Sequence, residues 1–169
     1  MTAEIPAFAQ VFREQAPRVL RCLLRLGVRQ ADVDDVLQEV FLIVHQKLPS
    51  YDARAPLGAF IYGIALRKAS DYRRRAHIVR EKSVDAVPEE GGTDQESVLA
   101  GREGLARLDE ALQELADDKR EAFVLYEIEG LSLSEIAEAT RTPLKTVHSR
   151  IASARLELGE RLRQKGSLS

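Results

Sequence analysis

The chain is poor in sulfur-containing residues and has no tryptophan. Its 169 residues include one cysteine, Cys22, and one methionine. A single cysteine excludes an intramolecular disulfide framework and a cysteine-rich zinc site, and it fits a reducing compartment. The three histidines, His45, His77 and His148, are scattered, so we expect neither a metal nor a cofactor. Cys22 lies in an apolar helical pattern and is interpreted as a buried small hydrophobe.

Long apolar runs and common catalytic motifs are also missing. No run approaches the roughly 18 apolar residues that span a membrane, and the start, MTAEIPAFAQVFREQ, lacks the basic and apolar regions of a secretory signal. The sequence contains no P-loop, HExxH, CxxC or GxSxG motif. We therefore expect a cytoplasmic protein that is not an enzyme and has no small-molecule substrate.

The net charge of −2 hides a strong segregation of charge along the chain. Residues 62–82 and residues 141–169 each carry seven basic and two acidic side chains, a net charge of +5. Between them, residues 83–100 carry five acidic and no basic side chains, and residues 101–140 carry eleven acidic and four basic ones. The basic blocks indicate local contacts with phosphates, while the near-neutral total argues against indiscriminate coating of polyanions.

Apolar residues recur at helical spacings of three, four and seven through most of the chain. This periodicity predicts helices at about residues 8–26, 33–44, 57–75, 105–115, 120–128 and 143–158, with a short helix after Ser132 that carries Ile136 and Ala137. No stretch alternates with period two, so we expect an all-α fold. Residues 83–101 are expected to form a flexible acidic linker between two small helical domains, 1–82 and 102–169. Bundles of this size are marginally stable alone, so partner contacts are expected to matter.

The strongest local pattern is a helix-turn-helix in residues 131–158. Ser132 and Glu135 form an S-x-x-E capping box before a short helix. Thr142 and Pro143 are interpreted as the N-cap and first residue of a second helix. That helix exposes short polar and basic side chains, which suit the base edges and phosphates of a major groove. A plain helical hairpin with a solvated face is the alternative, and the caps, short turn and local charge favour DNA binding.

A second pattern is the basic helix expected at residues 60–82, which carries Tyr62 and Tyr72 and follows Tyr51. Cations that track a nucleic-acid backbone and rings that stack on unpaired bases are typical of single-strand binding. Core packing is the alternative, and it is the better interpretation for Phe60 and Tyr72. Tyr51 lies in a predicted loop and is therefore the stronger candidate for a base contact.

A third pattern lies in residues 31–48. The apolar stripe of this helix leaves Asp35, Gln38, Glu39 and Leu42 together on the opposite face. An acidic stripe with one exposed leucine can dock against a basic partner helix. A solvated face is the alternative, and for this stripe taken alone it is the more common outcome.

The order of these segments makes the chain resemble a known family. D-V-D-D-V-L-Q-E-V-F is followed by L-P-S-Y, by F-I-Y-G-I-A with D-Y-R-R-R, and then by E-G-L-S-L-S-E-I-A and T-P-L-K-T-V-H-S-R. Over about residues 8–160 this arrangement resembles the extracytoplasmic-function (ECF) group of the sigma-70 family of bacterial RNA polymerase sigma factors. The resemblance implies that 1–82 is sigma region 2, which binds core polymerase and reads and melts the −10 element. It also implies that 102–169 is region 4, which reads the −35 element as duplex.

The resemblance also implies site residues and partners. The β′ clamp helices of core polymerase would contact the stripe of Asp35, Gln38, Glu39 and Leu42. The −10 DNA would contact Ser50, Tyr51, Asp52, Arg67, Lys68, Arg73, Arg74 and Arg75. The −35 DNA would contact Thr142, Lys145, Thr146, His148, Ser149, Arg150, Ser153 and Arg155. The β flap of polymerase and an anti-sigma factor are further implied partners, and polymerase binding would bring the protein to the nucleoid.

The chain departs from the family pattern at Phe60, usually Trp, at Arg67, often Asn, and at Lys145, usually Gly. These departures imply an unusual promoter preference or regulatory partner. We also hypothesise that the carboxylates of the linker fold back on the basic blocks and lower DNA affinity in the free chain. The alternative function is a conventional helix-turn-helix regulator that binds a palindromic site as a dimer, which would leave residues 31–48 and 60–82 without a role.

Overall fold

The computed structural model describes residues 4–82 and 100–167. Within these ranges the secondary structure consists of helices, with no β-strand. The elements are α1 (Phe8–Arg25), α2 (Val33–Lys47), the short 3-10 helix Leu48–Ser50, α3 (Leu57–Lys82), α4 (Ala100–Gln113), α5 (Asp117–Phe123), the π-helix Val124–Ile128, α6 (Leu133–Thr140) and α7 (Leu144–Gly166). The predicted all-α class is confirmed. Most of the predicted linker lies outside the described residues, and its last two positions are the start of α4.

The first three helices form a small bundle around the apolar stripes predicted from the sequence. Val19 and Leu23 of α1, Val40 of α2 and Ile61 of α3 are all fully buried in it. Cys22 is fully buried as well, which confirms its interpretation as a core residue. The helix α3 ends at Lys82, as predicted for the basic helix over residues 60–82, so the whole basic block of residues 62–82 lies on one helix.

The turn after α1 depends on Gly27. Its φ of +96° lies in a region that side chains rarely adopt, and glycine commonly ends helices in this way. A Cβ at Gly27 would also lie 3.2 Å from the Arg73 Cδ and the Arg120 Nη2. Glycine is therefore required here for the backbone turn and for the close approach of two arginine side chains.

The segment predicted as one helix over 120–128 differs in the structure. The α-helix begins earlier, at Asp117, and after Phe123 it widens into the π-helix Val124–Ile128. The Glu129 N–H donates to the Val124 carbonyl at 3.0 Å, a bond that spans five residues. Apolar periodicity does not distinguish this local widening from an ordinary α-helix, and Val124 and Leu125 are buried although the turn that carries them is a π-turn.

The helix-turn-helix forms as predicted, with one correction. The Ser132 hydroxyl accepts from the Glu135 N–H and the Glu135 carboxylate accepts from the Ser132 N–H, which confirms the capping box. The predicted N-cap at Thr142 is wrong, because Pro143 takes the cap position and α7 begins at Leu144. The Thr142 hydroxyl instead donates to the Thr140 carbonyl at 3.1 Å.

The capping box gives a first testable prediction. We expect Ser132→Ala to lower the free energy of unfolding by about 0.5–2 kcal/mol, because α6 loses the acceptor for an otherwise unpaired N–H. Ser134→Ala is the matched control, since Ser134 is exposed in the first turn of the same helix. Urea denaturation followed by circular dichroism measures both variants, and equal losses would contradict a capping role for Ser132.

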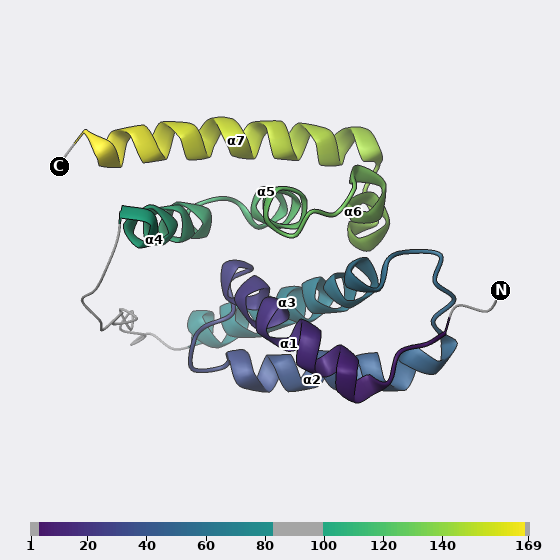
Figure 1. Cartoon of the computed structure of the whole chain (residues 1–169). Helices are drawn as coiled ribbons and strands as arrows, with labels where there is room; N and C mark the ends of the chain where they lie inside the picture. Colours follow the sequence, from purple (N-terminus) through teal and green to yellow (C-terminus); the bar gives the residue numbers. More distant parts are fainter. Residues whose placement is uncertain (1–3, 83–99, 168–169) are drawn as a thin grey trace.

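The two halves of the chain pack against each other. In Figure 1, α7 runs along one side, and α4, α5 and α6 lie between it and the layer of α1, α2 and α3. The helix α6 contacts α3, and α4 contacts α1. The buried apolar side chains of both halves belong to one continuous cluster. The sequence predicts two bundles but not this interface between them.

Candidate polymerase and DNA interfaces

The predicted polymerase-binding stripe lies on the outer face of α2. Asp35, Gln38 and Leu42 are exposed, and Leu42 retains 63% of its accessible surface. Glu39 is only partly exposed because it turns toward α3. Its Oε2 lies 3.2 Å from the Lys68 Nζ and 3.9 Å from an Arg75 guanidinium nitrogen. One carboxylate of the stripe is thus shared with two of the cations predicted to bind −10 DNA.

The loop after α2 presents an aromatic surface. The Tyr51 ring packs against the Phe60 ring at 5.2 Å between centroids, and its hydroxyl donates to the Ala55 carbonyl. Ser50 and Asp52 beside it are exposed. Both rings are partly exposed, so together they offer a surface on which an unpaired base can stack. Phe60 packs here as predicted, and it forms one wall of the predicted base site.

A cavity of about 450 Å³ lies between this loop and α6. Tyr51, Phe60 and Arg67 line it from the first half of the chain. Glu135 and Glu138 of α6 line it from the other half. In this arrangement the carboxylates of the helix-turn-helix face the surface predicted to receive −10 DNA.

The basic side chains of α3 have different environments. Arg67, Arg74 and Arg75 are exposed, and Arg74 pairs with Asp71 on its own helix. Arg73 is the exception, with only 13% of its side chain exposed. The prediction that Arg73 contacts −10 DNA therefore requires the two halves to separate.

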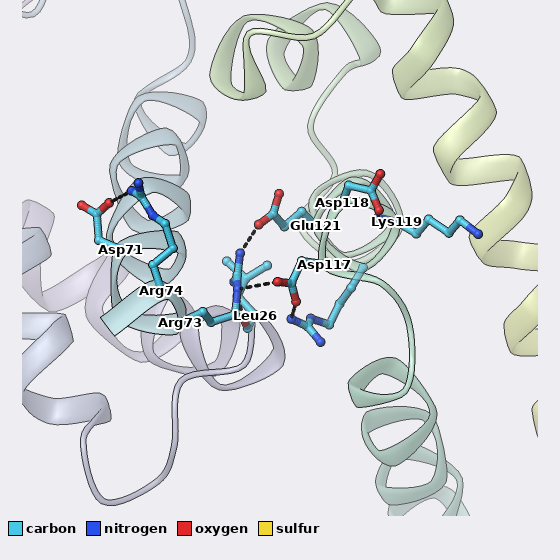
Figure 2. A network of polar contacts seen from close by, with 9 residues as sticks. Leu26, Asp71, Arg73, Arg74, Asp117, Asp118, Lys119 and Glu121 are labelled. Atoms are coloured by element: carbon cyan, nitrogen blue, oxygen red, sulfur yellow. Dashed lines mark hydrogen bonds and ion pairs between the residues drawn. The ribbon is translucent and has the colours of Figure 1, made fainter. Parts of the chain in front are cut away.

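Arg73 makes three contacts, two of which join the two halves, and Figure 2 shows them from close by. It donates to the Leu26 carbonyl at the end of α1 and to the Glu121 carboxylate of α5. Its Nε lies 3.4 Å from the Asp117 Oδ2. Asp117 also accepts from Arg120, whose side chain is only 5% exposed. These contacts connect all of α1, α3 and α5.

Three members of this network, Arg73, Arg120 and Glu121, are largely shielded from water, whereas the Asp117 side chain is 61% exposed. Burial raises the pKa of the Glu121 carboxyl, and the neighbouring Arg73 opposes that shift. Burial also lowers the pKa of the Arg120 guanidinium, against the attraction of Asp117. For both groups desolvation is thus the stronger influence on the pKa. The network is polar and specific, but its desolvation cost offsets much of its electrostatic attraction.

Further contacts between the halves flank this network. The Arg25 Nε lies 3.2 Å from the Asp109 Oδ1, and the Gln113 side chain donates to the Arg25 carbonyl at 3.2 Å. Burial is the main cause that raises the pKa values of Cys22 and Tyr62, and Glu129, just after the π-helix, raises both further through its charge and a hydrogen bond. None of these carboxylates is predicted from the sequence. The available signal for these contacts was the excess of acidic side chains in residues 101–140, which matches the excess of basic side chains in residues 62–82.

The predicted −35 residues occupy the first part of α7 and the turn before it. Lys145, His148, Ser149 and Arg155 are exposed. Thr142, Thr146, Arg150 and Ser153 are partly buried. The buried side of the helix carries Val147, Ile151, Ala154 and Leu158, as predicted. The outer face of α7 therefore remains accessible while the two halves are in contact.

Two of the arginines in this group are held by other side chains of the second half. The Arg150 Nε lies 3.3 Å from the Asp118 Oδ2, and its Nη1 donates to the Thr142 hydroxyl at 3.3 Å. Arg155 pairs with Glu127 and lies 5.6 Å from the centre of the Tyr126 ring. These contacts orient both guanidinium groups on the side of α7 that faces α5 and the π-helix.

The described parts of the chain hold neither a cluster of metal-ligating side chains nor a membrane-spanning helix. Within 4–82 and 100–167 no three His, Cys, Asp or Glu side chains are grouped so that they could hold a metal ion. No helix in these ranges combines the length and the hydropathy that crossing a membrane requires.

Comparison with known proteins gives one consistent family. Residues 11–77 match the family model of Sigma-70 region 2, and residues 105–158 match that of Sigma-70 region 4. The ECF RNA polymerase sigma factor SigE of Mycolicibacterium smegmatis is 32% identical over 98% of this chain, which spans 65% of the length of SigE. The RNA polymerase sigma factor CnrH of Cupriavidus metallidurans is 29% identical over 90% of this chain and 84% of its own length.

Solved structures agree with the fold. CnrH in complex with the cytosolic domain of CnrY has a TM-score of 0.67 and 28% identity, over 93% of this chain and 88% of that one. RpoE in complex with the anti-sigma factor NepR from Bartonella quintana has a TM-score of 0.72 over 92% of this chain and 96% of that one, and at 24% identity it supports the fold alone. Since each helical half matches one region of the same family, in the order that family has them, the chain belongs to the ECF group of the sigma-70 family of RNA polymerase sigma factors.

Proposed function

We propose that this chain directs core RNA polymerase to specific promoters and starts transcription there. Residues 1–82 act as region 2, which binds the β′ clamp helices and the −10 element. Residues 102–169 act as region 4, which binds the −35 duplex and the β flap. The observation that carries the proposal is that one chain holds both surfaces, the α2 face with exposed Leu42 and the exposed face of α7. A conventional dimeric regulator needs only the second.

The proposed mechanism involves binding and no covalent step. Region 4 holds the duplex through Lys145 at a phosphate and through His148 and Ser149 at base edges, and Arg155 reaches a phosphate only by leaving its pair with Glu127. Region 2 captures a base that has left the helix, and stacking against Tyr51 offsets the few kcal/mol that unstacking costs. Melting is then driven by the affinity of region 2 for the single strand. The site of action is the bacterial cytoplasm, on the nucleoid once polymerase is bound.

We also propose that a protein of the anti-sigma class regulates this chain. The support is that CnrH, which is 28% identical, has been solved in complex with the cytosolic domain of CnrY. The exposed α2 stripe and the exposed face of α7 are the surfaces that such a partner would cover. Covering either would block one of the two proposed binding events.

Reconstituted transcription tests the proposed function. The full chain and bacterial core polymerase are incubated with fragmented genomic DNA of the source organism, and transcript 5′ ends are mapped. We expect new 5′ ends that share a two-part upstream motif and are absent with core polymerase alone. Absence of any new start, together with dimeric binding to a palindrome without polymerase, would instead support the conventional regulator.

The aromatic loop gives a second prediction. We expect Tyr51→Ala to weaken binding of the polymerase complex to single-stranded −10 DNA by about 1–3 kcal/mol, the range measured for loss of one stacking ring. Tyr51→Phe keeps the ring and removes only the hydroxyl that donates to Ala55, so it should bind nearly as the parent does. Fluorescence anisotropy with a labelled non-template strand measures both. Equal losses in the two variants would contradict a stacking role.

A further inference from the structure

The contact between the two halves has a geometric consequence if the proposed function holds. The −10 and −35 elements are centred about 25 base pairs apart, which is about 85 Å along B-form DNA at 3.4 Å per pair. In the structure α6 of the second half lies directly on α3 of the first, and a Cβ built at Gly63 would lie 3.8 Å from the Ala139 Cβ. The described arrangement is therefore a closed one, from which the halves must separate before both elements are bound.

We propose that Arg73 acts as a latch that holds the free chain closed, and that Asp117 and Glu121 of α5 occupy it in place of DNA phosphates. This inference rests on the proposed function for its biological consequence. A guanidinium recognises a carboxylate and a phosphate through the same fork of N–H donors. Arg73 cannot engage both at once, because its side chain is already bound on three sides and only 13% exposed.

The chemistry of the network makes the latch specific and reversible. Desolvation of Arg73, Arg120 and Glu121 offsets much of their mutual attraction, so this polar network by itself adds only modestly to the stability that the shared apolar cluster gives the closed state. Neutralisation of both Asp117 and Glu121, in contrast, leaves the largely buried charge of Arg73 without a carboxylate partner and disfavours closure. A partner that binds only separated halves, such as core polymerase, can then shift the population to the open state.

Closure affects the two DNA-binding surfaces unequally. The α6 carboxylates Glu135 and Glu138 line the same cavity as the partly exposed rings of Tyr51 and Phe60, so a single strand that approaches these rings meets two negative charges. Lys145, His148 and Ser149 remain exposed on the outer face of α7. The closed chain should therefore reject single-stranded −10 DNA while it still binds −35 duplex.

An engineered disulfide measures closure without any DNA. The 3.8 Å separation at Gly63 and Ala139 equals the mean Cβ separation of about 3.8 Å in disulfides. In the full chain carrying Gly63→Cys and Ala139→Cys, we expect rapid disulfide formation on mild oxidation. The native Cys22 is fully buried with a raised thiol pKa, which keeps it unreactive. Failure of the pair to cross-link would overturn the closed arrangement in solution.

The latch itself is tested by the rate of that cross-link. We expect Asp117→Asn with Glu121→Gln to slow disulfide formation about tenfold or more, because the open state gains population. Glu114→Gln with Glu127→Gln is the matched control, since it removes two charges from the same half whose partners, Arg161, Lys165 and Arg155, lie on α7. The control should react at the parent rate. Equal rates in all three proteins would overturn the role of Arg73 and its carboxylates, whatever the transcription experiment shows.

The oxidised protein then tests the consequence of closure. With promoter fragments from the mapped transcription starts, we expect single-strand binding to fall at least tenfold on oxidation and to recover on reduction. Duplex binding should be unchanged. Equal single-strand affinity in both redox states would overturn the proposed occlusion. No binding of either DNA in the reduced state would instead count against the proposed function, while the cross-linking rates still decide the latch.

Discussion

Replacing Asp35 and Leu42 together by arginine should abolish co-purification of the chain with core RNA polymerase. Both side chains are exposed on α2, on the stripe proposed to meet a basic partner helix. One substitution replaces an anion of the proposed interface by a cation, and the other replaces its apolar side chain by a cation. Like charges brought together across an interface cost several kcal/mol. A loss of a hundredfold or more in affinity is the expected size, measured by pull-down and by fluorescence titration.

The design avoids Glu39 because its carboxylate already pairs with Lys68 and Arg75, so reversing it would also disturb α3. Asp34→Arg is the matched control, since Asp34 is exposed beside Asp35 but lies outside the stripe. Circular dichroism should show unchanged helix content in both proteins. Normal polymerase binding by the double variant would refute the assignment of this face.

The second large effect is expected on the outer face of α7. Ser149→Glu should reduce affinity for −35 duplex by roughly a hundredfold, because a carboxylate is placed against the phosphates and acceptor-rich base edges of the major groove. Gln164→Glu adds the same charge to an exposed position near the other end of the same helix. It should have little effect on affinity. Anisotropy at two salt concentrations distinguishes a local clash from general repulsion, and an equal loss in both variants would contradict recognition by this face.

The local architecture could largely be predicted from the sequence. Periodic apolar residues place α1, α2 and α7, and the S-x-x-E pattern predicts the box that begins α6, because each signal concerns residues only a few positions apart. The same locality explains the errors. Thr142 is a residue type that often caps helices. Arg141 before it has a left-handed backbone conformation, and Pro143 rather than Thr142 takes the N-cap position of α7.

The contacts between the halves could not be predicted in this way. Arg73 meets Glu121 across 48 residues of sequence, and no short pattern links the two. Composition carried a partial signal, since the acidic excess of residues 101–140 requires basic partners that α3 could supply. Which arginine of α3 pairs with these carboxylates depends on tertiary packing, in particular on the space beside Gly27 that the Arg73 side chain occupies. The residues proposed to bind polymerase and DNA remain predictions, which the polymerase pull-down and the DNA-binding measurements test.

The π-helix Val124–Ile128 bears on how a chain of this kind can change over generations. Its Glu129 N–H donates to the Val124 carbonyl five residues earlier, so this single turn holds one residue more than an α-helical turn would, at the junction between α5 and the segment leading into α6. Loss of one codon inside this turn would restore α-helical winding and leave α5 and α6 in nearly the same orientation. Loss of one codon between Glu121 and the π-helix would instead rotate the start of α5 by about 100° and carry Asp117 and Glu121 away from Arg73. We therefore expect single-residue deletions to be tolerated better inside the π-helix than in the last turn of α5.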